Sequence, residues 1–223
     1  MVLVHGWGGS FATTWQRSGF TELLADAGRP VIGVDLLGHG EAPKPHDPEA
    51  YADMTGRIED ALPADRVDAV GFSLGALTLL RLAIRRPAAF RRIVVAGIGR
   101  SAFERDDVVR ARVLAGLDGT AEPEDNLARL FSQYADQPGN DRLALAAVMR
   151  RDDATALTPD ALAAVTVPVL VVLGDRDFAG PADPLVAALP DARLVTLRNV
   201  DHFATPESFG FIDATLEFLD AQT

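Results

Sequence analysis

The sequence predicts an α/β fold: a mostly parallel sheet of about six strands with flanking helices. Short runs rich in β-branched residues alternate with longer stretches of helical pattern along the chain. Several of the short runs are unbroken apolar segments, which is typical of strands buried on both faces of a parallel sheet. The length of 223 residues allows one large domain or a core with one insertion, but not two full domains.

Six short apolar runs are the candidate strands. They are Met1–Val4, Pro30–Asp35, Val67–Phe72, Arg92–Ala96, Val167–Leu173 and Ala192–Thr196. The expected helices between and after them are Trp15–Ala27, Ala50–Leu62, Leu74–Arg86, Pro181–Leu189 and Pro206–Ala221. In the last helix Phe209, Ile212, Leu216 and Leu219 recur at helical spacing, so this face is expected to dock on the sheet.

One stretch, residues 101–165, interrupts this alternation. It contains no convincing strand, only helical pattern separated by turn residues such as Gly119 and Pro138. It carries seven basic and twelve acidic residues. We interpret it as a helical cap, called the cap segment below, inserted into a core of residues 1–100 and 166–223. Two ordinary crossover helices joined by a long loop are the alternative.

The composition excludes several classes of function. With 21 basic and 32 acidic residues the net charge is −11, which disfavours binding to nucleic acid or to an anionic membrane surface. The chain has no cysteine, which excludes disulfides, thiolate catalysis and cysteine-ligated metals, and a Schiff base would depend on the lone lysine, Lys44. No run is long enough to span a membrane and nothing resembles a signal peptide, so we expect a cytoplasmic protein.

The sharpest local motif is Gly71-Phe72-Ser73-Leu74-Gly75, which follows an apolar strand and opens an apolar helix. A nucleophilic serine on such a tight turn needs strained backbone angles, and the flanking glycines let strand and helix pass closely. The helix N-terminus also favours the negative charge that develops during attack. Ser73 is therefore the candidate nucleophile.

A serine nucleophile needs a base, and the chain order nucleophile, acid, histidine requires a histidine after Ser73. His202 is the only one of the four histidines that meets this requirement. The orienting acid is expected just past a strand end, where Asp175 and Asp177 both lie. We favour Asp177 because it lies further from the strand and keep Asp175 as the alternative. Asp201 adjoins His202 in sequence, and neighbouring side chains usually point apart.

The N-terminal run Val4-His5-Gly6-Trp7-Gly8-Gly9-Ser10 is a glycine-rich turn after the first strand. Such a turn can direct backbone N–H groups towards a substrate oxygen. The N–H groups of Trp7 and Leu74 are the candidate oxyanion donors. The run lacks the Gly-Lys-Ser/Thr ending of a phosphate-binding loop.

Five motifs occur together in order along nearly the whole chain. They are His5-Gly6-Trp7-Gly8-Gly9, Asp35-Leu36-Leu37-Gly38-His39-Gly40, Gly71-Phe72-Ser73-Leu74-Gly75, Gly174-Asp175-Arg176-Asp177 and Asp201-His202-Phe203. This set resembles the α/β-hydrolase superfamily. The resemblance implies that superfamily's fold, with the roles given above for Ser73, Asp177 and His202, for Trp7 and Leu74, and for the cap segment. It implies structural roles for His5 and His39, and no cofactor or metal.

The chain departs from the usual pattern of this superfamily at its first strands. Members usually have two strands before the His-Gly loop, whereas Met1 here already stands at the third, so six strands are expected in place of eight. The chain is either a minimal member or its true start lies upstream.

The nucleophile separates branches of this superfamily. Dehalogenases and epoxide hydrolases on this scaffold carry Asp at the elbow, so Ser73 argues against both. We expect a serine hydrolase that cleaves small-molecule carboxylic esters of small to medium acyl groups. Carbon–carbon bond hydrolases and cofactor-free perhydrolases share the triad and remain alternatives. A non-catalytic ligand-binding module is a further alternative. The His-Gly-Trp-Gly run also resembles methylesterases of pimeloyl esters.

The acyl pocket is expected to be lined by aromatic and apolar side chains from core and cap. The candidates are Phe72, Phe103, Phe131, Met149, Phe178 and Phe203. Other apolar residues of the cap helices, some of which should line the pocket, are Leu114, Leu130 and Leu145. The acyl chain length, the alcohol and the oligomeric state do not follow from the sequence.

Overall fold

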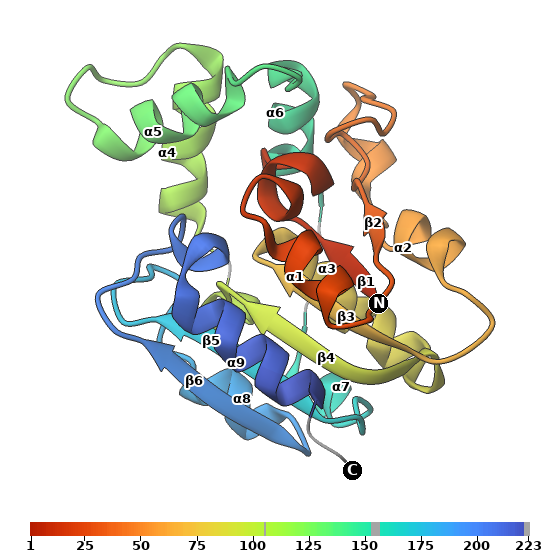
Figure 1. Cartoon of the computed structure of the whole chain (residues 1–223). Coiled ribbons are helices and arrows are strands. Elements are labelled where there is room, and N and C mark those ends of the chain that lie inside the picture. The colour runs from red at the N-terminus through yellow and green to blue at the C-terminus, as the bar shows by residue number, and fades with distance from the viewer. Residues whose placement is uncertain (105, 153–156, 221–223) are drawn as a thin grey trace.

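The computed structural model describes residues 1–104, 106–152 and 157–220, and its strands there form one parallel sheet (Figure 1). The strand order is β2-β1-β3-β4-β5-β6, and every neighbouring pair is parallel. The strands are β1 (Val2–Val4), β2 (Ile32–Val34), β3 (Val67–Phe72), β4 (Phe90–Ala96), β5 (Val169–Gly174) and β6 (Ala192–Leu197). The predicted fold class is confirmed, and each expected strand is present within about two residues of its predicted bounds.

Helices cover both faces of the sheet. One face packs against α2 (Gly56–Ala61), α3 (Leu74–Arg85) and α8 (Asp183–Ala188), and the other against α1 (Phe20–Asp26) and α9 (Phe209–Asp220). Strand residues alternate between these two cores: Val2 and Val4 join the first, and Met1 and Leu3 join the second. The fully buried strand β5 is a continuous apolar run for this reason, and β3 is one apart from Asp68.

Three helix predictions need correction. The expected helix Trp15–Ala27 is divided at Gly19 (φ 76°) into a π-helical turn, η1 (Ala12–Gln16), and α1. The expected helix Ala50–Leu62 is a 3₁₀ turn, η2 (Pro48–Tyr51), followed by α2. The expected helix Pro206–Ala221 is a 3₁₀ turn, η5 (Thr205–Glu207), followed by α9, and Ala221 lies outside the described residues. In α9, Phe209 is 84% exposed, and the buried face is Phe211, Ile212, Thr215, Phe218 and Leu219.

Residues 101–165 lie between β4 and β5 in the chain. Within the described part of this segment the helices are α4 (Asp107–Asp118), α5 (Asn126–Ala135), α6 (Arg142–Arg150) and α7 (Pro159–Leu162). Figure 1 shows α4, α5 and α6 together at one end of the molecule. The carboxylates of Asp106, Asp125 and Asp141 accept hydrogen bonds from the first free N–H groups of α4, α5 and α6, which explains where these helices begin.

The cap helices α4, α5 and α6 have a small apolar cluster of their own, whereas Leu162 of α7 joins the main core. Its buried members are Val113, Leu117, Ala135, Leu145 and Ala146. The indole of Trp7, from the loop after β1, packs against this cluster. The cap segment therefore contacts the core where β1 ends. Among the described residues, no helix has both the length and the apolar character needed to cross a lipid bilayer.

Candidate active site

Ser73 occupies a strained turn between β3 and α3. Its backbone has φ 50° and ψ −113°, a positive φ that L-residues with side chains rarely adopt. A Cβ at Gly71 would lie 2.7 Å from the amide nitrogen of Ala76, and one at Gly75 would lie 2.5 Å from the carbonyl oxygen of Val4. Only glycine therefore fits at both flanking positions, as the sequence motif predicts.

A chain of hydrogen bonds links Ser73, His202 and Asp177. His202 Nε2 lies 3.0 Å from Ser73 Oγ, and His202 Nδ1 lies 3.0 Å from both Asp177 carboxylate oxygens. The Asp177 side chain is fully buried, and its Oδ1 also accepts a bond of 2.8 Å from the N–H of Ala179. A carboxylate can only accept here, so Nδ1 carries the proton and the lone pair of Nε2 faces the hydroxyl.

The two other aspartates considered from the sequence have different partners. Asp175 is exposed, and its Oδ1 accepts a hydrogen bond of 2.8 Å from the N–H of Asn199. Asp201 Oδ1 accepts a bond of 3.0 Å from the N–H of Ala204. Among the described residues, only Asp177 brings a carboxylate against His202.

Aromatic rings surround the His202 imidazole. The ring centroids of Phe178 and Phe72 lie 4.3 and 4.9 Å from that of His202, and Phe203 meets it edge-on at 5.5 Å. These three contacts restrict the imidazole to the plane in which both of its nitrogens meet their partners. All three rings were expected at the site from the sequence.

The Gly6–Gly9 loop lies directly against the serine. A Cβ at Gly6 would lie 3.3 Å from Ser73 Cβ and 2.8 Å from Phe72 Cδ1, so the main chain approaches as closely as glycine allows. Leu74 is the first residue of α3, where N–H groups have no intrahelical acceptor. Among the described residues, the backbone N–H groups of Trp7 and Leu74 donate no hydrogen bond. Both donors are therefore available to a ligand at Ser73.

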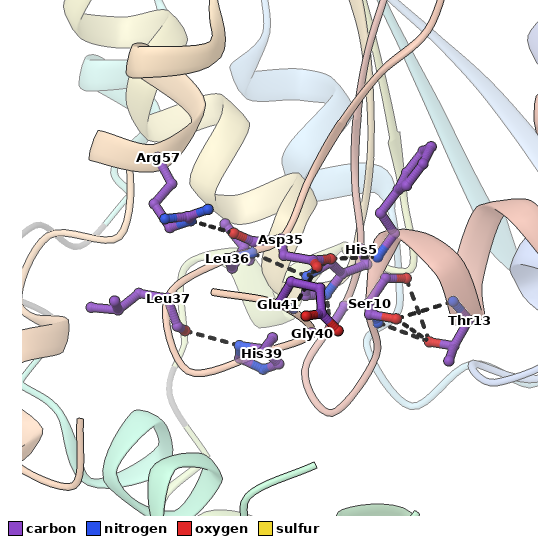
Figure 2. Close-up of polar contacts among 12 residues, drawn as sticks. His5, Ser10, Thr13, Asp35, Leu36, Leu37, His39, Gly40, Glu41 and Arg57 are labelled. Carbon is purple, nitrogen blue, oxygen red and sulfur yellow. Dashed lines mark hydrogen bonds and ion pairs between the residues drawn. The ribbon is translucent and has the colours of Figure 1, made fainter. Parts of the chain in front are cut away.

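Two buried histidines, His5 at the start of this loop and His39, lie with their ring centroids 5.1 Å apart (Figure 2). His5 Nδ1 donates to the carbonyl oxygen of Gly6 at 2.7 Å, while Nε2 accepts from the N–H of Leu36 at 3.1 Å. His39 Nδ1 donates to Leu37 at 2.9 Å. Burial lowers the pKa of both histidines, that of His39 to about 3, so both are neutral at pH 7. Neither contacts Ser73, which agrees with structural roles.

Two neighbouring cavities open beside the serine. The first, of about 240 Å³, includes Ser73 and His202, and its apolar wall comes from core and cap. The second, of about 390 Å³, lies between α4, α5 and α6. The residues that line both are Val109, Phe131, Met149, Arg151 and Phe178. Because the cavities share this wall, we call them the serine cavity and the cap cavity and treat them as neighbouring compartments.

Most of the pocket residues expected from the sequence line the serine cavity. Those that line the serine cavity are Phe72, Phe131, Met149, Phe178 and Phe203. Among the described residues, Phe103 does not line either of these two cavities and packs against the main core. Sequence reasoning missed Leu77, Val109, Val113, Tyr134 and Arg151. The four-residue spacing of Val109 and Val113, one turn apart on α4, is the only local signal that pointed to any of them.

Comparison with known proteins agrees with this geometry. A model of the alpha/beta hydrolase family matches residues 1–214. The chain is 31% identical to a pimeloyl-(acyl-carrier protein) methyl ester esterase of Neisseria meningitidis serogroup C, over 91% of this chain and 86% of that protein. It is 39% identical to a 2-hydroxy-6-oxo-2,4-heptadienoate hydrolase of Pseudomonas putida, over 48% of this chain and 40% of that one.

A solved structure supports the fold. The enol-lactonase of Burkholderia xenovorans superposes with a TM-score of 0.77 at 23% identity, covering 99% of this chain and 90% of that one. The family match and the superposition each cover most of the chain. The chain belongs to the alpha/beta hydrolase family and, like the relatives named here, is a hydrolase.

Proposed function

We propose that the chain is a carboxylic-ester hydrolase that acts through an acyl-enzyme on Ser73. The observation that carries the proposal is the continuous contact from Asp177 through His202 to Ser73, with two free N–H groups beside the serine. Nucleophile, base, orienting acid and oxyanion donors are the parts that acyl transfer requires.

The cycle follows from these contacts. Ser73 Oγ attacks the ester carbonyl while its proton passes to His202 Nε2, and Asp177 stabilises the resulting imidazolium. The oxyanion accepts hydrogen bonds from the N–H groups of Trp7 and Leu74, each typically worth about 3 kcal/mol. Collapse expels the alcohol, which takes the proton from His202. Water activated by the same histidine then releases the acid and restores Ser73.

The shape of the site supports small to medium acyl groups. The serine cavity of about 240 Å³ has mostly apolar walls, with Arg151 among its lining residues, and the apolar part of this wall suits an acyl chain. A relative over most of the chain is named a methyl ester esterase, which supports ester cleavage as the chemistry.

Carbon–carbon bond hydrolysis is the second candidate. A 2-hydroxy-6-oxo-2,4-heptadienoate hydrolase shares 39% identity with about half of this chain, and the same serine and histidine could serve that reaction. The two candidates differ in substrate while sharing the nucleophile.

The test combines substrates with a covalent readout. In a series of p-nitrophenyl esters from acetate to palmitate, the short and medium members should be hydrolysed best. Intact-mass spectrometry under burst conditions should show one acyl group, absent in Ser73→Ala. Ser18→Ala is the matched control, since Ser18 lies outside the site and bonds only to the carbonyls of Thr14 and Trp15. Failure of every ester, with fluorophosphonate labelling of Ser73 retained, would favour carbon–carbon hydrolysis. Failure of labelling as well would indicate a binding module.

A further inference from the structure

The loop that carries the oxyanion donor Trp7 is held from two sides. On the core side, His5 donates to the carbonyl oxygen of Gly6, and the N–H of Gly9 bonds to the same oxygen at 3.2 Å. These contacts fix the first half of the loop. In the second half of the loop, the side chain of Trp7 and the carbonyl oxygen of Gly8 both contact the cap segment.

Asn140 makes the most direct of these cap contacts. It lies between α5 and α6, and its Nδ2 donates to the carbonyl oxygen of Gly8 at 2.7 Å and to that of Tyr134 at 3.0 Å. Both partners can only accept, so the orientation of the amide is fixed. One side chain therefore ties the loop to the end of α5.

Two further contacts join the same partners. Trp7 Nε1 donates to the carbonyl oxygen of Leu145 on α6 at 3.2 Å, and its ring centroid lies 5.3 Å from that of Phe131. The ring of Tyr134 covers Gly8 so closely that a Cβ there would lie 2.5 Å from Tyr134 Cδ1. Gly8 has φ 72°, so its conformation and its space both require glycine.

We propose that Asn140 is a positioning residue through which the cap segment holds the oxyanion loop in its catalytic shape. The N–H of Trp7 lies in the same loop as the carbonyl that Asn140 binds, so movement of α5 and α6 away from the core would displace this donor. The oxyanion site is thus complete only when the cap segment is seated. This inference rests on the proposed function, because it concerns the position of the Trp7 N–H, one of the two proposed oxyanion donors.

The test uses two substrates that differ in one atom: a p-nitrophenyl ester and its thionoester, in which sulfur replaces the carbonyl oxygen. Sulfur is larger and accepts hydrogen bonds more weakly, so a well-placed oxyanion site favours the oxygen ester. Asn140→Ala should lower kcat/KM for the oxygen ester about tenfold, mainly in kcat, and change the thionoester rate much less. A merely structural role would lower both rates by the same factor.

The matched control is Asn126→Ala, in the same segment. The Asn126 side chain accepts a bond of 2.7 Å from Arg129 at the exposed surface, away from the loop. It should leave both rates within about twofold of the parent. Titration of reactive Ser73 measures the fraction of active enzyme. Should Asn140→Ala fold poorly, Trp7→Phe is a second variant, which loses the bond to Leu145 and keeps an aromatic ring next to Phe131.

The outcomes separate this inference from the proposed function. An unchanged oxygen-to-sulfur ratio in both Asn140→Ala and Trp7→Phe, in a parent that hydrolyses the ester, overturns the positioning role alone. A parent that attacks neither substrate and forms no acyl-enzyme overturns the proposed ester hydrolysis itself. A selective loss of the oxygen-ester rate supports both.

Discussion

The sheet core and the cap segment contribute different kinds of groups to the site. Ser73, Asp177 and His202 all stand just after strands, on backbone that the sheet fixes, and the carboxylate among them is fully buried. The cap contributes apolar walls, such as Phe131 and Met149, and contacts to the Gly6–Gly9 loop. In the proposed mechanism the reacting groups therefore depend on the rigid sheet, whereas the shape of the pocket depends on helices with a small apolar cluster of their own.

The largest expected effect lies in the core and separates two aspartates of one loop. Asp177→Asn should lower kcat by up to about 10⁴-fold with the fold intact, because His202 loses the group that fixes its tautomer and stabilises its cation. Asp175→Asn, which loses only an exposed bond from Asn199, should retain most of the activity. Steady-state kinetics with circular dichroism checks both. The reverse ranking would transfer the acid role to Asp175.

A matched pair of leucines compares the stability of the two regions. Leu80 on α3 and Leu145 on α6 are both fully buried, one in the main core and the other in the cap cluster. Leu80→Ala should cost about 3–5 kcal/mol in the free energy of unfolding. Leu145→Ala should cost about 2–3 kcal/mol, since a small cluster can collapse around the lost volume. Urea denaturation measures both, and an equal or larger loss at Leu145 would mean that the cap is packed as rigidly as the core.

The same division explains how far the sequence predicted the fold. The strands were predicted because a buried parallel strand is a continuous apolar run; β5 is such a run throughout, and β3 is one apart from Asp68. β4 begins at Phe90, two residues before its predicted start. Its first two residues, the buried Phe90 and the exposed Arg91, do not form the continuous apolar run by which the other strands were predicted. Phe209 was misplaced because helical spacing fits more than one face of α9, and only packing selects among them.

The site shows the same limit. Ser73, His202 and Asp177 were proposed from local motifs and chain order, and the structure brings their side chains together. Asn140 and Tyr134 had no such signal, because the Asn140–Gly8 contact joins residues 132 positions apart in sequence. Contacts between cap and core depend on how the two segments pack against each other, and the hydrophobic periodicity within either segment does not predict that packing.

The pH dependence of the free energy of unfolding tests the effect of burying His39 in the core. Burial, and then the nearby His5, lower the pKa of His39 from 6.5 to about 3. The unfolded chain therefore binds a proton that the folded chain does not between pH 6.5 and 3, so stability falls as the pH drops through this window. His39 alone should remove about 2 kcal/mol between pH 7 and 5, and His5 adds to the loss in the same direction.

The variant His39→Asn keeps a donor for the carbonyl of Leu37 but removes the titrating ring. Its absolute stability should be lower, yet its loss between pH 7 and 5 should be smaller than in the parent. Urea titrations at the two pH values measure the difference. An unchanged pH slope would show that other groups, such as carboxylates at the surface, dominate acid unfolding.

The smallest expected effect concerns selectivity and belongs to the cap. Phe131 lines both cavities, whereas its neighbour Leu130 on α5 is 41% exposed and lines neither within the described residues. Phe131→Leu should open the shared wall and raise the ratio of kcat/KM for decanoate over butyrate esters by about tenfold, equivalent to about 1.4 kcal/mol. Leu130→Ala should leave this ratio unchanged. A flat ratio in Phe131→Leu with a lowered melting temperature would mean that Phe131 only joins cap to core through Trp7, and the cap cavity would then not receive the acyl chain.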